Sequence, residues 1–396
     1  MKSYDAVIVG GGASGIVAAV FAKRKGASVL LCEKMPKLGK KLLVTGAGRC
    51  NLLNEKLNES FYNPEARDLV RSVLGRCGKD AMLGFFRELG LQVAADETGR
   101  IFPVTQQAAS VLKVLELEVT RLEITVKLDC EVQDLRAVAG AFEVRTASEE
   151  RFVSPKVILC AGGKSYPALG ADGSAYVLAQ KFGHTVTEPV PCVVPLLAKD
   201  PWCHFLQGQK IRAKVTARVD GKPVSEAAGE LLFTQYGLSG TAVLDVSREI
   251  SIAVNRDGKK IASVTADLIP AMNEGELKKE FGRRLERKFP REELLEGLLP
   301  HKFSLAFRDI LQKEDVAALV KVLKHKEFKV SGTRGWNEAE FTAGGVPAEE
   351  VDIATLESNR QKGLYLAGEV LDVQGARGGY NLAWAWASGA VAGSSI

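Results

Sequence analysis

The stretch YDAVIVGGGASGIVAAVFAKRKGASVLLCEK, residues Tyr4–Lys34, decides the fold of this chain. Val7–Val9 form a short apolar run of the kind that makes a buried strand, and a glycine-rich turn follows it at once. A helix of small residues should come next, and Ser28–Leu31 should form a second strand. This order of strand, glycine turn, helix and strand predicts a Rossmann-type unit that binds a dinucleotide.

The glycines of the turn stand at the G-x-G-x-x-G spacing, and each has a physical role. Gly10 permits the tight turn, Gly12 lets the backbone approach a pyrophosphate, and Gly15 lets helix and strand pack closely. The first N–H groups of the helix, at Ala13 and Ser14, should face the phosphates. A turn of this kind between a strand and a helix indicates a bound nucleotide rather than a bare loop.

An acidic residue stands where the second strand of this unit ends. Glu33 comes 18 residues after the last of these glycines and can accept a hydrogen bond from a ribose hydroxyl of an adenosine. The segment TGAGRCN, Thr45–Asn51, begins a dozen residues further along, and we expect it to run along the same extended cofactor. Within it Arg49, together with Lys40 or Lys41, would balance the charge of the cofactor or meet the substrate.

The end of the chain favours FAD over NAD as the resident cofactor. Residues 362–393 contain a strand that ends at Gly368-Glu369, a glycine-rich loop and a helix, an arrangement that places the acid on the ribityl chain in two-dinucleotide flavoproteins. A second G-x-G-x-x-G after a strand is absent from the sequence, so NADH or NADPH is expected only as a transient electron donor to one noncovalent FAD. The residues predicted to bind FAD are Gly10, Gly12, Ala13, Ser14, Gly15, Glu33, Lys34, Lys40, Thr45, Gly46, Gly48, Arg49, Cys50, Asn51, Val132, Ala161, Gly162, Gly163, Gly368, Glu369, Gly379, Tyr380 and Asn381.

The composition is that of a folded globular protein. The chain has 396 residues, 46% of them hydrophobic and 26% charged, and a length of this size predicts two or three domains. The net charge of +5 is mild, and basic residues in segments such as 278–293 alternate with Glu, which is typical of a solvated helix face. Nucleic acid is therefore not expected as a partner, and the oligomeric state stays open.

The seven cysteines are odd in number and show neither a CxxC pair nor Cys/His ligand spacing, so we expect no metal site. Cys50 has no partner at redox spacing, which favours a packed thiol near the flavin over a redox centre. The sequence passes from Met1 directly into a strand, and no apolar stretch approaches the ~20 residues of a membrane span. A cytoplasmic protein without a membrane partner is expected.

The pattern along the chain predicts an α/β fold in which an insertion separates two halves of the FAD-binding domain. Proline-punctuated and alternating segments begin at about residue 189, and a hairpin turn is expected at Asp220-Gly221. The expected parts are a first FAD-binding part at 1–188, a β-rich inserted domain at 189–268, a helical inserted domain at 269–328, a return strand of the β domain at 329–345, and the C-terminal FAD-binding part at 346–396.

Seven motifs in fixed order carry a resemblance to a known family. They are GGGASG, GKKLLVTGAGRCN, GRIFP, AGGKSYPALGADGSAY, GELLFTQYGLSG, FTAGGV and GLYLAGEVLDVQGARGGYNLAWAWASG. Over Val7–Gly393 this set closely resembles the bacterial flavoprotein family that includes aminoacetone oxidase and a 3-dehydro-bile-acid ene-reductase. The resemblance implies a single FAD, a Rossmann-type domain split by a β-barrel-like domain, and a small helical domain.

The chain departs from this family at three positions. Gln235 stands where the family often has His, Thr241 where it often has Pro, and Leu356 where Met is frequent. A proton transfer that used this His in relatives would lack its side chain here. The members of the family differ in activity, so the resemblance does not select the substrate.

Two reactions agree with these residues, since a flavin carries the redox step and the protein orients the substrate and moves protons. The favoured one is NAD(P)H-linked reduction of an activated C=C, as in an enone or steroid. The alternative is oxidation of an amine by dioxygen, and an alternative of another class is a flavoprotein that binds or modifies RNA. Arg377 is the first candidate for substrate contact, and Tyr380 and Tyr166, with Tyr236 behind them, are candidate acids.

Overall fold

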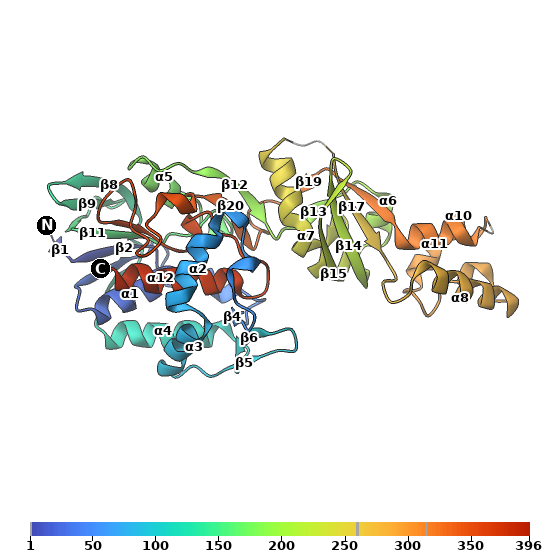
Figure 1. The fold of residues 1–396 in the computed structure, drawn as a ribbon, viewed down its shortest axis with the longest axis horizontal. Coiled ribbons are helices and arrows are strands. Elements are labelled where there is room, and N and C mark those ends of the chain that lie inside the picture. The colour runs from blue at the N-terminus through green and yellow to red at the C-terminus, as the bar shows by residue number, and fades with distance from the viewer. Residues whose placement is uncertain (1, 259–260, 314) are drawn as a thin grey trace. The chain divides into compact units, whose positions relative to one another are not determined.

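The computed structural model describes residues 2–258, 261–313 and 315–396, which form two compact units (Figure 1). The terminal unit consists of Met1–Pro189 and Glu340–Ile396, so it contains both ends of the chain. The inserted unit consists of Val190–Ala339. Each unit has its own hydrophobic core.

A five-stranded parallel sheet forms the centre of the terminal unit. In spatial order its strands are β21 (Leu364–Leu366), β11 (Lys156–Leu159), β2 (Ala6–Val9), β3 (Val29–Cys32) and β7 (Thr125–Lys127). Every residue of β2 and β3 is buried, as expected for short apolar strands of a parallel sheet covered on both faces. The predicted Rossmann-type unit is confirmed, and both of its first strands lie within one residue of their expected positions.

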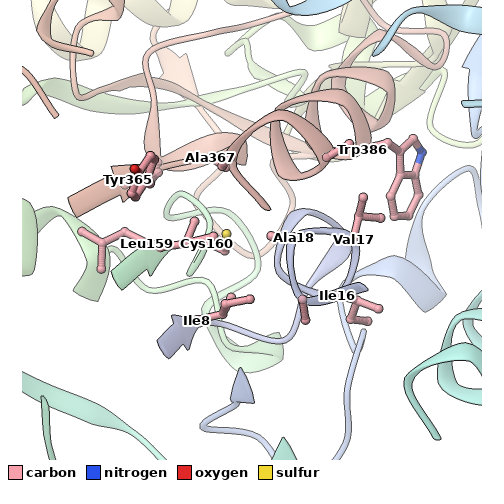
Figure 2. Packing of buried hydrophobic residues seen from close by; sticks show 14 of the residues in the cluster. Ile8, Ile16, Val17, Ala18, Leu159, Cys160, Tyr365, Ala367 and Trp386 are labelled. Atoms are coloured by element: carbon pink, nitrogen blue, oxygen red, sulfur yellow. The ribbon is translucent and has the colours of Figure 1, made fainter. Parts of the chain in front are cut away.

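The two ends of the chain pack against each other through helices α1 (Ala13–Arg24) and α12 (Tyr380–Ser394). A Cβ on Gly389 would lie 2.3 Å from the Ser14 carbonyl oxygen, and one on Gly393 would lie 2.3 Å from that of Ala18. Only glycine allows this approach of the two helices. Figure 2 shows the resulting core, in which side chains of α1 and α12 meet those of β2, β11 and β21.

The other elements of the terminal unit surround this core. A four-stranded sheet has the order β1 (Lys2–Ser3), β10 (Arg151–Ser154), β9 (Ala141–Thr146), β8 (Val132–Val138). A three-stranded sheet has the order β4 (Leu53–Asn54), β6 (Arg100–Pro103), β5 (Val93–Ala95). The remaining helices are α2 (Arg67–Cys77), α3 (Lys79–Glu88), α4 (Ala108–Arg121) and α5 (Ser174–Gln180).

The inserted unit is a seven-stranded antiparallel sheet with helices packed on it. In spatial order its strands are β18 (Lys326–Val330), β17 (Ala262–Asp267), β14 (Lys210–Val219), β15 (Lys222–Thr234), β16 (Gly237–Ser239), β13 (Leu196–Leu197) and β19 (Gly332–Thr333). The predicted hairpin turn is confirmed: Asp220 and Gly221 join β14 to β15, with φ of +50° and +75°. The helices are α6 (Pro201–Phe205), α7 (Thr241–Ser251), α8 (Glu274–Glu286), α9 (Lys302–Ala306), α10 (Arg308–Leu311) and α11 (Val316–Lys324).

Two details of the insertion differ from the sequence-based expectation. Within the described residues, the strand order ends at β18 and at β19 and no pairing joins these two strands, so the sheet does not close into a barrel. Strand β20 (Phe341–Gly345) belongs to the terminal unit, because it pairs with β12 (Thr187–Cys192) at the point where the chain leaves that unit. The expected return strand at 329–345 therefore ends too late.

The helical segment of the insertion shares the core of the sheet. Leu277 and Phe281 of α8 lie in the same buried cluster as Val215 of β14 and Val264 of β17. A separate helical domain at 269–328 stays a prediction.

Candidate active site

A cavity of ≈ 560 Å³ lies in the terminal unit, and residues from both ends of the chain line it. Seventeen of the residues predicted to bind FAD are in its wall: Gly10, Gly12, Ala13, Ser14, Glu33, Lys34, Lys40, Thr45, Gly46, Arg49, Asn51, Val132, Ala161, Gly162, Glu369, Gly379 and Asn381. Six predicted residues lie outside the wall: Gly15, Gly48, Cys50, Gly163, Gly368 and Tyr380.

The glycine turn has the geometry that a pyrophosphate needs. Gly10 has φ +104°, and a Cβ there would lie 2.7 Å from the Cα of Ala161, so any side chain would clash with the neighbouring strand turn. A Cβ on Gly15 would lie 1.8 Å from the carbonyl oxygen of Gly10. A Cβ on Gly12, in contrast, would meet nothing within 4 Å and would project into the cavity. The turn is tight on its inner side and open where α1 begins, which fits a phosphate at the helix N-terminus.

Glu33 lies where the adenosine end of a dinucleotide would be held. Its Oε2 accepts a hydrogen bond from the Gly11 backbone N–H at 2.7 Å, and its Oε1 accepts one from Met35 N–H at 2.8 Å. Burial raises the pKa of this carboxyl, and the two backbone hydrogen bonds oppose that rise. Each carboxylate oxygen keeps a second lone pair, so ribose hydroxyls can still donate to it. The adjacent Lys34 forms an ion pair with Asp172 at 2.7 Å.

A charged network at Glu369 joins the two ends of the chain inside the cavity. The Lys41 Nζ donates to Glu369 Oε2 and to Ser165 Oγ, each at 2.7 Å. Glu369 Oε1 accepts from the Ser165 hydroxyl at 3.1 Å and from the Thr342 backbone N–H at 2.7 Å. The carboxylate thus retains room for one more donor, such as a ribityl hydroxyl. The sequence leaves open whether Lys40 or Lys41 balances the charge of the cofactor; both residues line the cavity, and Lys41 forms the ion pair with Glu369.

The glycine-rich loop before α12 is fixed by asparagines from the N-terminal half. The Asn51 amide donates to the Leu53 carbonyl and accepts from the Gly379 N–H, both at 3.1 Å. The Asn54 amide donates to the Gly378 carbonyl at 2.9 Å. The segment TGAGRCN therefore does run along the cavity, and its last residue holds the start of α12.

Two of the three candidate catalytic residues line the cavity, and the third does not. Arg377 and Tyr166 line the cavity. Tyr380 is buried and outside the wall: its ring stacks on Phe61 at 4.4 Å between centroids, and its carbonyl accepts a hydrogen bond from Tyr62. Burial raises the pKa of the Tyr380 hydroxyl, which makes it a poorer acid. Its position is set by aromatic packing, which the glycine pattern around it does not reveal.

Arg100 and Phe102 are among the residues of the wall that sequence reasoning missed. Arg100 and Phe102 both line the cavity, whereas Ile101 between them is buried and pairs with Leu53. The alternation of side chains along a strand could have placed the first and third of these residues on one face. Tyr236 and Gln235 belong to the inserted unit, whereas the wall of this cavity comes from the terminal unit alone.

The described residues contain neither a metal-binding cluster nor a membrane-spanning helix. Over residues 2–258, 261–313 and 315–396, no group of three or more His, Cys, Asp or Glu side chains is arranged to hold a metal ion. Within the same ranges, none of the helices combines the length and the apolar character needed to cross a membrane.

The fold and the cavity define a Rossmann-type flavoprotein oxidoreductase, because both ends of the chain surround a cavity whose turn, acids and helix N-termini fit FAD. Residues 4–395 match the HI0933-like protein Rossmann domain, and the chain belongs to this family.

The chain is also similar to individual proteins of known name. The chain is 39% identical to the 3-dehydro-bile acid delta(4,6)-reductase of Clostridium scindens, over 98% of this chain and 97% of that protein. It is 31% identical to a ribosomal RNA dihydrouridine synthase of Haemophilus influenzae, over 100% and 99%. The quinol fumarate reductase subunit FrdA of E. coli matches the whole chain and 70% of its own length with a TM-score of 0.53 at 16% identity, a likeness of fold alone.

Proposed function

We propose that this protein is an FAD-dependent reductase of carbon–carbon double bonds conjugated to a carbonyl group. One observation supports this most: the near full-length similarity to a reductase named for the Δ4 and Δ6 double bonds of a 3-dehydro bile acid. The second named relative forms dihydrouridine, and uracil also carries a C=C conjugated to a carbonyl. The two names therefore describe different substrates and one kind of bond.

In this proposal each group of residues in the cavity wall holds one part of FAD. Glu33 would hold the ribose of the adenosine, and the N-terminus of α1 would hold the pyrophosphate. The pair of Lys41 and Glu369 would hold the ribityl chain. Asn51 and Gly379 lie at the N-terminus of α12, where the flavin ring would end.

When bound and reduced, FAD supplies a hydride to the β-carbon of the double bond, and NADH or NADPH is the proposed source of the electrons. The protein must then bind the carbonyl group and deliver a proton to the α-carbon. Tyr166 is the proposed proton donor, because its side chain is in the cavity wall and Tyr380 is not. Arg377 is the proposed substrate contact in the loop before α12.

An anaerobic experiment on the flavin absorbance tests the proposed function. NADH or NADPH should bleach the oxidised flavin, and 4-androstene-3,17-dione, a 3-oxo steroid with one conjugated C=C, should restore it. Mass spectrometry should then find a steroid product with two more hydrogens. Bleaching by an amine and rapid recovery with dioxygen, without recovery by the steroid, would instead establish the amine oxidase.

A second candidate is reduction of a uracil ring in RNA. It is favoured by relatives named ribosomal RNA dihydrouridine synthases, at 31% and 29% identity over at least 98% of this chain. The reduced protein, incubated with unmodified ribosomal RNA, would form dihydrouridine detectable by nucleoside mass spectrometry. Binding that weakens steeply with added salt would accompany it. Formation of dihydrouridine without reduction of the steroid would select this candidate.

A further inference from the structure

Strand β6 directs Arg100 into the cavity beside the loop that precedes α12. Ile101 belongs to the hydrophobic core of the terminal unit, and side chains alternate along a strand, so its neighbours Arg100 and Phe102 lie on the opposite face, where both line the cavity. Neither residue belongs to the parts of the wall assigned to FAD above. The side chain of Arg100 is half-buried.

No ion pair at 4 Å or less joins the guanidinium of Arg100 to a carboxylate in the described part of the chain, although the charge of Arg100 contributes to the lowered pKa of Asp96, against the effect of burial. The lysines of the same wall differ in this respect: Lys34 pairs with Asp172, and Lys41 pairs with Glu369. Asp96 accepts a hydrogen bond from Arg100, but from its backbone N–H, at 3.1 Å. A half-buried guanidinium loses part of its hydration and is stabilised when an anionic or polarised oxygen replaces that water.

The glycine-rich loop passes close to this guanidinium. A Cβ on Gly378, whose φ is +131°, would lie 3.5 Å from the Nε of Arg100 and 3.6 Å from the amide nitrogen of Asn54. The same amide donates to the Gly378 carbonyl at 2.9 Å. A side chain at position 378 would therefore contact the guanidinium of Arg100, and the glycine leaves this side of the guanidinium uncovered.

A second guanidinium lies along the same face of β6. The Cζ of Arg49 is 4.7 Å from the centroid of the Phe102 ring, which is two residues from Arg100 on the strand. Its Nε donates to the Gly46 carbonyl at 3.3 Å, and its two terminal nitrogens form no ion pair with a described carboxylate. Two guanidinium groups thus line this end of the wall, and neither is in an ion pair with a described carboxylate.

We propose that Arg100, with Arg49 beside it, forms an oxyanion site that binds the carbonyl oxygen of the conjugated substrate. This inference rests on the proposed function. In that reaction a hydride adds to the β-carbon, the π electrons of the C=C move toward the carbonyl, and its oxygen gains negative charge as an enolate. A proton then adds to the α-carbon, and NAD(P)H supplies the two electrons. Preorganised donors near such an oxygen stabilise the charge where it develops.

The test uses the FAD-loaded protein and two readouts. The first is binding of pentafluorophenol, whose phenolate is ionised at neutral pH and resembles an enolate; its binding should perturb the absorbance of the oxidised flavin. The second is the rate at which 4-androstene-3,17-dione reoxidises the reduced flavin. The variants are Arg100→Met and Arg100→Lys, with Arg87→Met as the control, since Arg87 is an exposed residue of α3 outside the cavity.

Arg100→Met should retain FAD, bind the phenolate about tenfold or more weakly, and reoxidise about 100-fold more slowly. Arg100→Lys should recover part of the phenolate binding, because it keeps the charge and loses the fork of donors. Arg87→Met should match the unmodified protein in both readouts.

The two readouts separate this inference from the proposed function. Phenolate binding that depends on Arg100 without reduction of the steroid would support the oxyanion site and count against the proposed reduction of this enone. Reduction of the steroid at the same rate in Arg100→Met would support the reductase and overturn the oxyanion site. Absence of phenolate binding in the unmodified protein would overturn the site as well.

Discussion

The Nζ of Lys41 lies 2.7 Å from Oε2 of Glu369, although 328 positions separate the two residues in the chain. Each side chain is about a fifth exposed. The pair joins the segment that follows the first Rossmann strands to the turn that precedes α12, and it lies in the wall of the cavity. The two ends of the chain are therefore joined by a charge pair as well as by the packing of α1 on α12.

Lys41→Met should weaken FAD binding by about tenfold or more, since a hydrogen bond to a charged group contributes about 1.5–3 kcal/mol and Glu369 would lose its counter-ion. The dissociation constant is measured by the recovery of FAD fluorescence on dilution. Lys37→Met, at an exposed position four residues earlier, is the matched control and should bind FAD as the unmodified protein does. If the two variants bind FAD with equal affinity, Lys41 does not contribute to the cofactor site.

Gly15→Ala should abolish FAD binding and lower the melting temperature. The new methyl group would lie 1.8 Å from the Gly10 carbonyl oxygen, so the turn and the start of α1 must move apart. Gly84→Ala is the control, because Gly84 is exposed on α3 and a Cβ there meets nothing within 4 Å. This control should gain about 0.5–1 kcal/mol of stability from the higher helix propensity of alanine. Normal FAD binding by Gly15→Ala would contradict the packing described for the turn.

The sequence predicted those parts of the fold that depend on local patterns. The glycine spacing at Gly10–Gly15 and the buried strands on either side follow from short-range geometry, and so does the turn at Asp220-Gly221. Local patterns could not predict to which of the two units β20 belongs. This depends on pairing with β12, about 150 residues earlier, and an apolar run does not state which strand it will pair with.

In the site, too, the residues placed by local motifs could be predicted, and those placed by distant contacts could not. The residues of the glycine turn and Glu33 could be located from the motif, because the backbone itself makes the contacts. The position of Tyr380 could not be predicted, because it depends on stacking with the distant Phe61 ring. Alternation along β6 places Arg100 and Phe102 on one face, but the sequence does not show that this face meets the cavity. Charge and aromatic character suggest a role for a side chain, and only tertiary packing decides which side chains reach the cavity.

Cys50→Ser should keep FAD and most of the turnover. The Cys50 side chain is buried outside the cavity wall, and burial raises the pKa of its thiol to about 12, with a hydrogen bond to Thr45 opposing the rise. The thiol is thus protonated and a weak nucleophile at neutral pH. Thiol labelling of the folded protein should spare Cys50 and reach the half-buried Cys77 first. Loss of all turnover with FAD retained would give Cys50 a role in the chemistry.

A buried polar cluster in the terminal unit leads to the last prediction. His184 contacts Glu350 Oε2 through Nδ1 at 2.6 Å and Ser358 Oγ through Nε2 at 2.7 Å. Glu350 also accepts hydrogen bonds from the backbone and hydroxyl groups of Thr185. The cluster ties the end of α5 to the segment before β21, and its residues lie outside the cavity wall.

Burial alone would raise the pKa of Glu350, but the hydrogen bonds from Thr185 and His184 outweigh it and lower the pKa below the usual 4.5. Because the folded state favours the ionised carboxylate, Glu350 stabilises the protein above pH 4.5 and loses this effect as the pH falls through its folded pKa. Glu350→Gln should therefore lower the free energy of unfolding by about 2 kcal/mol at pH 7, and the difference should shrink below pH 4.5. Melting temperatures of both proteins across this range test the prediction, with Glu349→Gln as the exposed control. A difference that stays constant down to pH 3 would show that the charge of Glu350 does not stabilise the fold.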